Sequence, residues 1–290
     1  MKKITKAVIP AAGFGTRFLP FTKAMPKEML PIVDIPTIEY IVREAMESGI
    51  TQFLIIINEG KECIKSHFGE SKALEKFLQE KNKTEELKII HELPEKIHLE
   101  YVYQHQQLGL GHAVLCAKDF VQGEAFALLL GDDVYVGKDK PATLQLAEAY
   151  EKTGCSVLGT LEVPNCDVSK YGICEPEEQS EGALVKLKRV VEKPRLEEAP
   201  SNLAIGGRYI LTPAIFKYLE TQTRGAGGEI QLTDSILRLM QEESVYSLAI
   251  EGRRYDIGSK KGFLEATVDF ALKREDLHDA MEEILRKYTK

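Results

Sequence analysis

A glycine-containing loop with nearby cations follows the first apolar segment of the chain. Residues 11–17 read AAGFGTR, and Lys27 and Glu28 follow shortly after. The two glycines let the backbone approach a ligand closely and turn its N–H groups toward phosphate oxygens, while Arg17 and Lys27 supply positive charge. The loop could therefore hold a triphosphate. A tight strand-to-helix turn with solvated cations would show the same short pattern.

A second polar loop, residues 104–112, contains groups that could recognise a nucleobase. Gln104 offers both a donor and an acceptor to a base edge, and Gly109 permits main-chain contact with the base. A polar turn with a helix cap is the alternative. For His112 we favour that alternative, because no other histidine lies at metal-ligand spacing.

An acidic pair, Asp132 and Asp133, follows the most apolar segment of the chain. Mg²⁺ prefers one or two protein carboxylates together with phosphate oxygens and water, so this position suits a metal ligand. An Asp that forms a turn by accepting backbone N–H bonds is the alternative. A metal site needs a partner carboxylate, and Asp256 in the segment YDIG supplies one from far along the chain.

Three further motifs are KYG at 170–172, VVEKP at 190–194 and GGEIQLTD at 227–234. Glu192 and Lys193 are adjacent, so on an extended strand they would point to opposite faces unless Pro194 bends the chain. Taken alone, they are better explained as a solvated ion pair on an exposed edge. The last motif also resembles a helix start, with Thr233 or Asp234 as the cap.

Several functional classes are disfavoured. The dinucleotide fingerprint GxGxxG needs a third glycine where this chain has Phe18, and the P-loop motif is absent from the sequence. The 45 acidic and 38 basic residues give a net charge of −7, hence no overall positive field for nucleic acid or an anionic membrane. Five cysteines without a CxxC pair fit a reducing cytoplasm better than a disulfide framework or a zinc site.

Targeting and membrane segments are also not expected. The longest apolar runs are far shorter than the roughly 20 residues that a membrane helix needs. Pro10 and Gly13 interrupt the only stretch that resembles a signal peptide, so we treat the N-terminus as mature structure.

The elements that must position these residues alternate between strand and helix. Short apolar runs predict strands at 6–12, 52–57, 99–104 and 125–130. Helical periodicity predicts helices at 38–46, 61–68, 112–120 and 142–152. This alternation favours a parallel, doubly wound sheet, in which ligands bind at the carboxyl ends of strands. The three polar loops described first lie there.

The second half of the chain is richer in strands. Apolar runs predict strands at 155–163, 171–175, 184–191 and 203–211, and helices return at 213–220 and 232–241. We therefore expect an α/β fold, a Rossmann-like doubly wound mixed sheet with an appended, more antiparallel portion. Residues 71–100 are expected to form a solvated helical excursion. An apolar stripe over 277–288 would either pack on its own core or contribute to a homo-oligomer.

The motifs together resemble a known family. Along residues 5–270 the chain contains, in order, AAGFGTR, PKEMLPI, QLGLGHAV, LGDD, VEKP, GAGGEIQLTD and YDIGS. This combination resembles the sugar-nucleotidyltransferase family, and within it the bacterial UTP–glucose-1-phosphate uridylyltransferases. Relatives that make other sugar nucleotides share the GxGxR loop and the EKP motif, whereas PKEML and GEIQLTD resemble the UDP-glucose branch. Gly131 differs from the pattern of the UDP-glucose branch, because many of its members have proline at this position.

The resemblance implies roles for individual residues. It assigns nucleotide binding to Ala11, Ala12, Gly13, Gly15, Thr16, Glu28, Gln104 and Gly109. It assigns the sugar to Tyr171, Gly172, Glu192, Lys193 and Gly207. It assigns Mg²⁺ to Asp132 and Asp256, and catalytic contacts to Arg17, Lys27, Lys193 and Asp132. Whether Asp133 assists the metal is left open.

The implied reaction transfers UMP from UTP to glucose 1-phosphate and yields UDP-glucose and pyrophosphate. A sugar phosphate with a second pKa of about 6 is largely a dianion at pH 7, so it can attack without a general base. The protein's task is then positioning and charge neutralisation. The alternatives are a related enzyme that uses dTTP, ATP or GTP, and a non-catalytic sugar-nucleotide sensor. A nicotinamide oxidoreductase is the weakest alternative, for want of the third glycine.

We expect one nucleotidyltransferase domain over residues 1–290. Its nucleotide-binding half would span about 1–152, its sugar-binding half about 153–273 and a C-terminal helix about 274–290. The resemblance further implies a cytoplasmic homodimer or homotetramer with no nucleic-acid or membrane partner.

Overall fold

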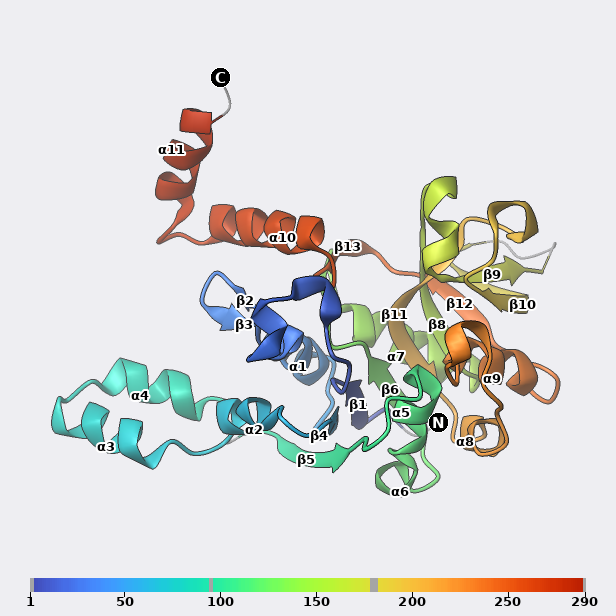
Figure 1. Ribbon diagram of the computed structural model, residues 1–290, viewed down its shortest axis with the longest axis horizontal. Helices are drawn as coiled ribbons and strands as arrows, with labels where there is room; N and C mark the ends of the chain where they lie inside the picture. The colour runs from blue at the N-terminus through green and yellow to red at the C-terminus, as the bar shows by residue number, and fades with distance from the viewer. Residues whose placement is uncertain (1–2, 94–95, 178–181, 289–290) are drawn as a thin grey trace.

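The computed structural model describes residues 3–93, 96–177 and 182–288, and its main feature is a nine-stranded sheet (Figure 1). In spatial order its strands are β5 (His98–Tyr103), β4 (Gln52–Ile57), β1 (Lys6–Pro10), β6 (Phe126–Leu129), β11 (Leu203–Leu211), β8 (Val157–Glu162), β12 (Tyr246–Ala249), β10 (Leu184–Glu192) and β9 (Gly172–Pro176). Helices cover both faces of this sheet. The expected doubly wound mixed sheet is confirmed.

The helices connect the strands as the periodicity predicts, with a few additions. They are α1 (Thr37–Glu47), α2 (Glu62–Phe68), α3 (Lys72–Glu80), α4 (Thr84–His91), α5 (Leu110–Leu115), α6 (Lys118–Val121), α7 (Ala142–Thr153), α8 (Ile215–Leu219), α9 (Leu232–Leu239), α10 (Lys260–Lys273) and α11 (His278–Tyr288). The single helix expected at 112–120 is two short helices. The N–H of Ala117 bonds the carbonyl of Val114, three residues back, so the backbone tightens and α5 ends.

The first half of the sheet is parallel. Strand β1 pairs in parallel with β4 and β6, and β4 pairs in parallel with β5. Alternate β1 side chains enter two separate cores, Ala7 and Ile9 under α1 and α7, and Val8 under α5, α8 and α9. Because these strands run the same way, their carboxyl ends open at one edge, where the loops after Pro10, Tyr103 and Leu129 begin.

The second half of the sheet is mainly antiparallel. Strand β11 pairs antiparallel with both β6 and β8, and β10 pairs antiparallel with β12 and β9, while β12 and β8 are parallel. Strand β11 therefore joins the two halves. Its residues from Ala204 to Leu211 are all buried.

Two small two-stranded sheets were not predicted. One pairs β2 (Pro31–Ile32) with β3 (Ile35–Pro36), and the other pairs β7 (Asp133–Gly137) with β13 (Gly252–Asp256). In the second, Asp256 lies opposite Asp133. This antiparallel pairing returns the distant YDIG segment to the acidic loop after β6.

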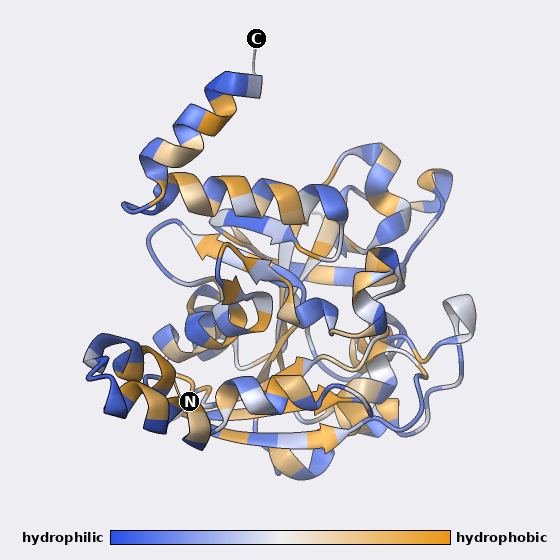
Figure 2. Ribbon diagram, turned by 60° about the vertical axis from the view of Figure 1, so that its left-hand side comes forward, coloured by the Kyte–Doolittle hydropathy of each residue, from blue (hydrophilic) through white to orange (hydrophobic). Residues whose placement is uncertain are grey.

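Two helical features project from the body of the molecule (Figure 1). The α3–α4 pair forms the charged excursion expected at residues 71–100 as far as His91; residues 94–95 lie outside the described ranges, and the expectation is wrong from His98, where β5 begins. Helix α11 extends from the end of α10, alternates polar and apolar residues (Figure 2) and has no buried residue. Packing of the C-terminal stripe on the chain's own core, one of the two alternatives, is therefore wrong. No helix in the described ranges is long and apolar enough to span a membrane.

Candidate active site

The three predicted loops meet around one cavity of about 430 Å³ at the carboxyl edge of the parallel strands. Most of the residues expected to bind the nucleotide line it, together with the expected metal ligand of the acidic loop. These are Ala12, Gly13, Arg17, Lys27, Glu28, Gln104, Gly109 and Asp132. Ala11 is buried behind the loop, and Gly15 and Thr16 lie next to the cavity at the start of a short 3₁₀ helix.

Two side chains that the sequence analysis missed hold the first loop in place. Asn58 Nδ2 donates to the carbonyl of Ala12 at 2.7 Å. Lys61 Nζ donates to the carbonyl of Gly13 at 2.7 Å and to that of Ala11. The loop carbonyls are thereby turned toward Asn58 and Lys61. No local pattern announces these contacts, because each joins residues 46 or more positions apart.

A network of buried charges lies beneath the cavity. Lys61 also pairs with Glu28 at 2.9 Å, and Lys27 pairs with Asp132 and lies 4.0 Å from Glu28. Burial raises the pKa of Glu28, against the opposing effect of Lys61. Burial alone would also raise the pKa of Asp132, but Lys27 and Arg17 lower it overall. Asp132 therefore stays ionised.

The side-chain amide of Gln104 orders the second polar loop, residues 104–112. Gln104 is buried, and its Nε2 lies 3.2 Å from the Gly109 carbonyl and 2.9 Å from His112 Nδ1. His112 thus orients Gln104 from within α5 and does not cap the helix. Gly109 has φ of 107°, and a Cβ there would lie 2.8 Å from the Ile230 carbonyl oxygen. Glycine is therefore required where this loop meets the segment around Ile230.

The two proposed metal ligands, Asp132 and Asp256, come together where β7 and β13 pair. A Cβ added at Gly258 would lie 2.5 Å from Asp132 Oδ2 and 3.0 Å from Asp256 Oδ1. Both carboxylates thus face one small space that only glycine leaves open. Within the described parts of the chain, no group of three or more His, Cys, Asp or Glu side chains could hold a metal. A two-carboxylate site still suits Mg²⁺, which takes its remaining ligands from phosphate and water.

Asp133 points elsewhere. Its Oδ1 lies 2.5 Å from Arg254 Nη2, and its Oδ2 occupies the position that a Cβ at Gly207 would take. Gly207 has φ of 80°, so both conformation and space require glycine there. Burial raises the pKa of Asp133 to about 6, against the opposing effect of Arg254. Arg254 was not predicted as a site residue.

The residues expected to bind the sugar gather beside the cavity. Glu192 Oε2 accepts a hydrogen bond from Thr233 Oγ1 at 2.6 Å, and a Cβ at Gly172 would lie 3.3 Å from that oxygen. Lys193 pairs with Glu192 at 3.2 Å, as expected. Glu192 is, however, only 11% exposed, so the description as a solvated pair is wrong for the carboxylate.

Backbone geometry explains why Lys193 pairs with Glu192 and why α9 has no side-chain cap. Lys193 itself adopts φ of 44°, which turns the chain before Pro194 and brings its side chain back to Glu192. Helix α9 begins at Leu232 without a side-chain cap, so Thr233 is a partner of Glu192 and neither it nor Asp234 is the cap. The N–H of Ile230, in the same segment, donates to the carbonyl of Leu108 in the second polar loop, and the Ile230 carbonyl accepts from the N–H of Gly111. The segment 225–234 thus connects the two regions.

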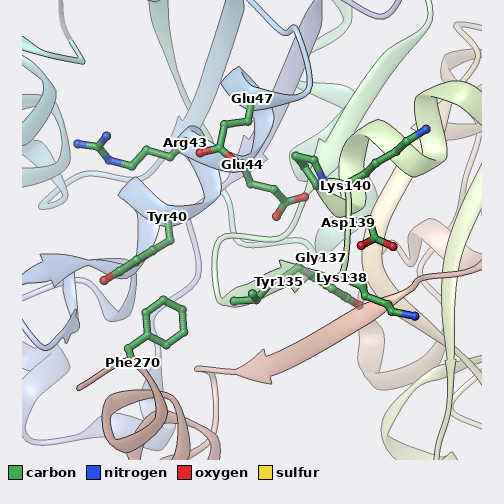
Figure 3. Close-up of a pocket in the computed structure, with 12 residues that line it drawn as sticks. Tyr40, Arg43, Glu44, Glu47, Tyr135, Gly137, Lys138, Asp139, Lys140 and Phe270 are labelled. Atoms are coloured by element: carbon green, nitrogen blue, oxygen red, sulfur yellow. The ribbon is translucent and has the colours of Figure 1, made fainter. Parts of the chain in front are cut away.

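A second cavity of about 440 Å³ lies between α1, the β7–α7 connection and Phe270 of α10 (Figure 3). Its labelled side chains include Tyr40, Glu44 and Lys138, and none of the predicted site residues lines it. Glu44 pairs with the buried Arg208 and accepts hydrogen bonds from Thr143, which is a structural role. The first cavity is therefore the candidate active site.

Comparisons with known proteins identify the family of the chain. Residues 6–272 match the family model described as nucleotidyl transferase. The UTP–glucose-1-phosphate uridylyltransferase 2 of Staphylococcus saprophyticus is 53% identical over 287 residues, 99% of each chain.

Solved structures agree as well. A structure of a UDP-glucose pyrophosphorylase complexed with UDP-glucose has a TM-score of 0.85 and 42% identity, covering 93% of this chain and 100% of that one. The UTP-bound UGPase of Acinetobacter baumannii has a TM-score of 0.89 and 38% identity, covering 97% and 98%. The chain therefore belongs to the nucleotidyl transferase family and groups with its UTP–glucose-1-phosphate uridylyltransferases.

Proposed function

We propose that this chain transfers UMP from UTP to glucose 1-phosphate, giving UDP-glucose and pyrophosphate. The observation that carries the proposal is the cavity in which Arg17, Lys27 and Asp132 face the base-recognition residues Gln104 and Gly109. Its close relative in Staphylococcus saprophyticus is named for this reaction, and related solved structures hold UTP or UDP-glucose. A site rich in cations, glycines and paired carboxylates suits two anionic substrates.

The reaction needs no protein base. An oxygen of the glucose 1-phosphate dianion attacks the α-phosphorus of UTP, and the bond from that phosphorus to the bridging oxygen of the β-phosphate breaks. The electron pair leaves with pyrophosphate. Arg17 and Lys27 neutralise charge on the triphosphate, and Lys193 neutralises charge on the sugar phosphate. The backbone of the first loop, held by Asn58 and Lys61, orients the nucleotide.

Asp132 and Asp256 would hold Mg²⁺, because their carboxylates share the space that Gly258 leaves open. When bound, this ion would supply further positive charge to the phosphates. Lys27 lies against Asp132, which keeps that carboxylate ionised and ready to act as a ligand.

On the nucleotide side, the uracil contacts Glu28, Gln104 and Gly109. The loop beneath the nucleotide consists of Ala11, Ala12, Gly13, Gly15 and Thr16. On the sugar side, Tyr171, Gly172, Glu192 and Gly207 contact the glucose. The ion pair of Glu192 with Lys193 supports this assignment, because it places the proposed phosphate-binding ammonium next to the proposed sugar-binding carboxylate.

The remaining proposals concern the domain, the assembly and the location of the chain. We infer that the chain forms one domain, with a nucleotide-binding half over about 1–152 and a sugar-binding half over about 153–273. We also infer that α11 contributes to a homodimer or homotetramer. All five cysteines lie in the described part of the chain as free thiols. Free thiols support the proposed cytoplasmic location.

The test is a comparison of nucleotides. Purified protein is incubated with Mg²⁺, glucose 1-phosphate and, in parallel, UTP, dTTP, ATP or GTP, and the sugar nucleotide formed is identified by mass. We expect UDP-glucose to form fastest. Faster turnover of another nucleotide would assign the chain to a different specificity, and binding without any product would make it a sensor.

A further inference from the structure

Arg254 lies between the two halves of the candidate site. On β13 side chains alternate between faces, so Arg254 shares a face with Asp256. Its neighbour Arg253 is on the opposite face and pairs with Glu265 and Asp269 of α10. Strand β13 thus presents one arginine to the site and one to a surface helix.

The contacts of Arg254 reach both halves. Its Nη2 lies 2.5 Å from Asp133 Oδ1, and its Nη1 lies 3.3 Å from the hydroxyl of Tyr171. The guanidinium also lies 5.4 Å from the centre of the Tyr171 ring. Tyr171 is a proposed glucose contact, whereas Asp133 is adjacent to the proposed metal ligand Asp132. Only 13% of the Arg254 side chain is exposed, so little water competes for these contacts.

Asp133 extends the connection to the backbone of the sugar site. Its second carboxylate oxygen fills the space beside Gly207, another residue proposed to line the glucose. A planar guanidinium can hold a carboxylate and a hydroxyl at a fixed angle, which the single ammonium of lysine cannot do. Arg254 is therefore suited to fix Tyr171 and Gly207 relative to the carboxylates of Asp132 and Asp256.

We propose that Arg254 is a positioning residue, which sets the glucose-binding side of the site relative to the metal-binding carboxylates through Tyr171 and Asp133. The proposal rests on the proposed function and deepens it, because it says how the sugar phosphate is brought in line with the α-phosphorus. It does not make Arg254 a ligand of either substrate. Its loss displaces the sugar side and leaves the nucleotide cavity, which Arg254 does not line, unchanged.

The test compares Arg254→Met and Arg254→Lys with Arg253→Met, a matched control from the opposite face of the same strand. For each variant KM and kcat are measured separately for glucose 1-phosphate and UTP, and UTP binding alone is measured by calorimetry. For Arg254→Met we expect KM for glucose 1-phosphate to rise about tenfold or more and kcat to fall, the scale of one lost charged contact. KM and Kd for UTP should change less than about twofold. Arg253→Met should match the wild type.

The lysine variant shows whether an effect on KM arises without loss of the fold. Arg254→Lys keeps the charge that Asp133 requires, so it should retain the wild-type melting temperature yet still show the selective rise in KM for glucose 1-phosphate. Equal losses for both substrates, or an unchanged KM for glucose 1-phosphate in the lysine variant, would overturn the positioning role. Wild-type protein that forms no UDP-glucose would overturn the proposed function and the positioning role with it. Active wild type with unaffected Arg254 variants would overturn the positioning role alone.

Discussion

At the scale of single residues, a few buried ionic groups shape the nucleotide side of the site. Lys61 is 5% exposed and bonds two loop carbonyls and the Glu28 carboxylate. Burial lowers the pKa of Lys61, and the charge and hydrogen bond of Glu28 oppose that effect in part. Such a pair contributes little net stability in itself, but removing one partner leaves the other buried and uncompensated.

We therefore expect Lys61→Met to lower the free energy of unfolding by about 3 to 5 kcal/mol and to raise KM for UTP more than KM for glucose 1-phosphate. Urea denaturation and steady-state kinetics measure the two effects. Lys65→Met is the matched control, because Lys65 lies in the helix α2 that Lys61 precedes and donates its hydrogen bond to the Tyr103 hydroxyl. Equal kinetic effects of the two variants would contradict the role assigned to Lys61.

Asp133 gives a pH-dependent prediction. Because its pKa rises to about 6 on folding, its protonated form stabilises the fold fully below about pH 4, and that contribution is lost as the pH rises through about 6. The unfolding free energy of the wild type, minus that of Asp133→Asn, should fall by up to about 3 kcal/mol between pH 4 and 7. Urea titrations at several pH values measure it, with Asp139→Asn as an exposed control. A difference that does not change with pH would contradict the raised pKa.

At the scale of elements, the antiparallel pair β7–β13 determines where the carboxylates proposed to bind the metal lie. It places Asp256 opposite Asp133 in register, and the backbone N–H of Ile257 bonds the Asp132 carbonyl at 2.9 Å. Two segments more than a hundred residues apart thereby form one site. Gly258 completes it by leaving space between the carboxylates.

We expect Asp132→Asn and Asp256→Asn each to reduce kcat by about a hundredfold to a thousandfold, which corresponds to about 3 to 4 kcal/mol. The double variant should lose far less than the product of the single losses, because the two ligands act as one unit. Activity is measured at limiting and at saturating Mg²⁺, with Asp139→Asn as control. Near-normal activity of Asp256→Asn at limiting Mg²⁺ would contradict the joint site.

The sequence predicted the bounds of helices and strands best where the hydrophobic pattern extended over many residues. Strand β4 and strand β11 have the predicted bounds, 52–57 and 203–211, because every residue of each strand after the first is buried. The pairing of β7 with β13 was missed, since β7 follows directly on the acidic turn and neither strand shows a long apolar run. Arg254, Asn58 and Lys61 were missed for a related reason. Their roles come from contacts across the fold, which no local spacing records.

At the scale of the whole molecule, α11 is the main element without a place in the core. Ile284 is 46% exposed and Tyr288 is 84% exposed, on a helix with no buried residue. We expect Ile284→Asp to lower the molecular mass measured by light scattering toward that of a smaller assembly. Lys287→Gln, on the charged face, should leave the mass unchanged. An unaltered mass for Ile284→Asp would contradict a role of α11 in self-association.

The central claim is that one cavity brings UTP and glucose 1-phosphate together for direct transfer. The most direct test is pyrophosphate release by the full-length protein with UTP, Mg²⁺ and glucose 1-phosphate, and with each of the three omitted in turn. We expect release only in the complete mixture, with one UDP-glucose formed for each pyrophosphate. Pyrophosphate released from UTP without glucose 1-phosphate, or no release in the complete mixture, would contradict it.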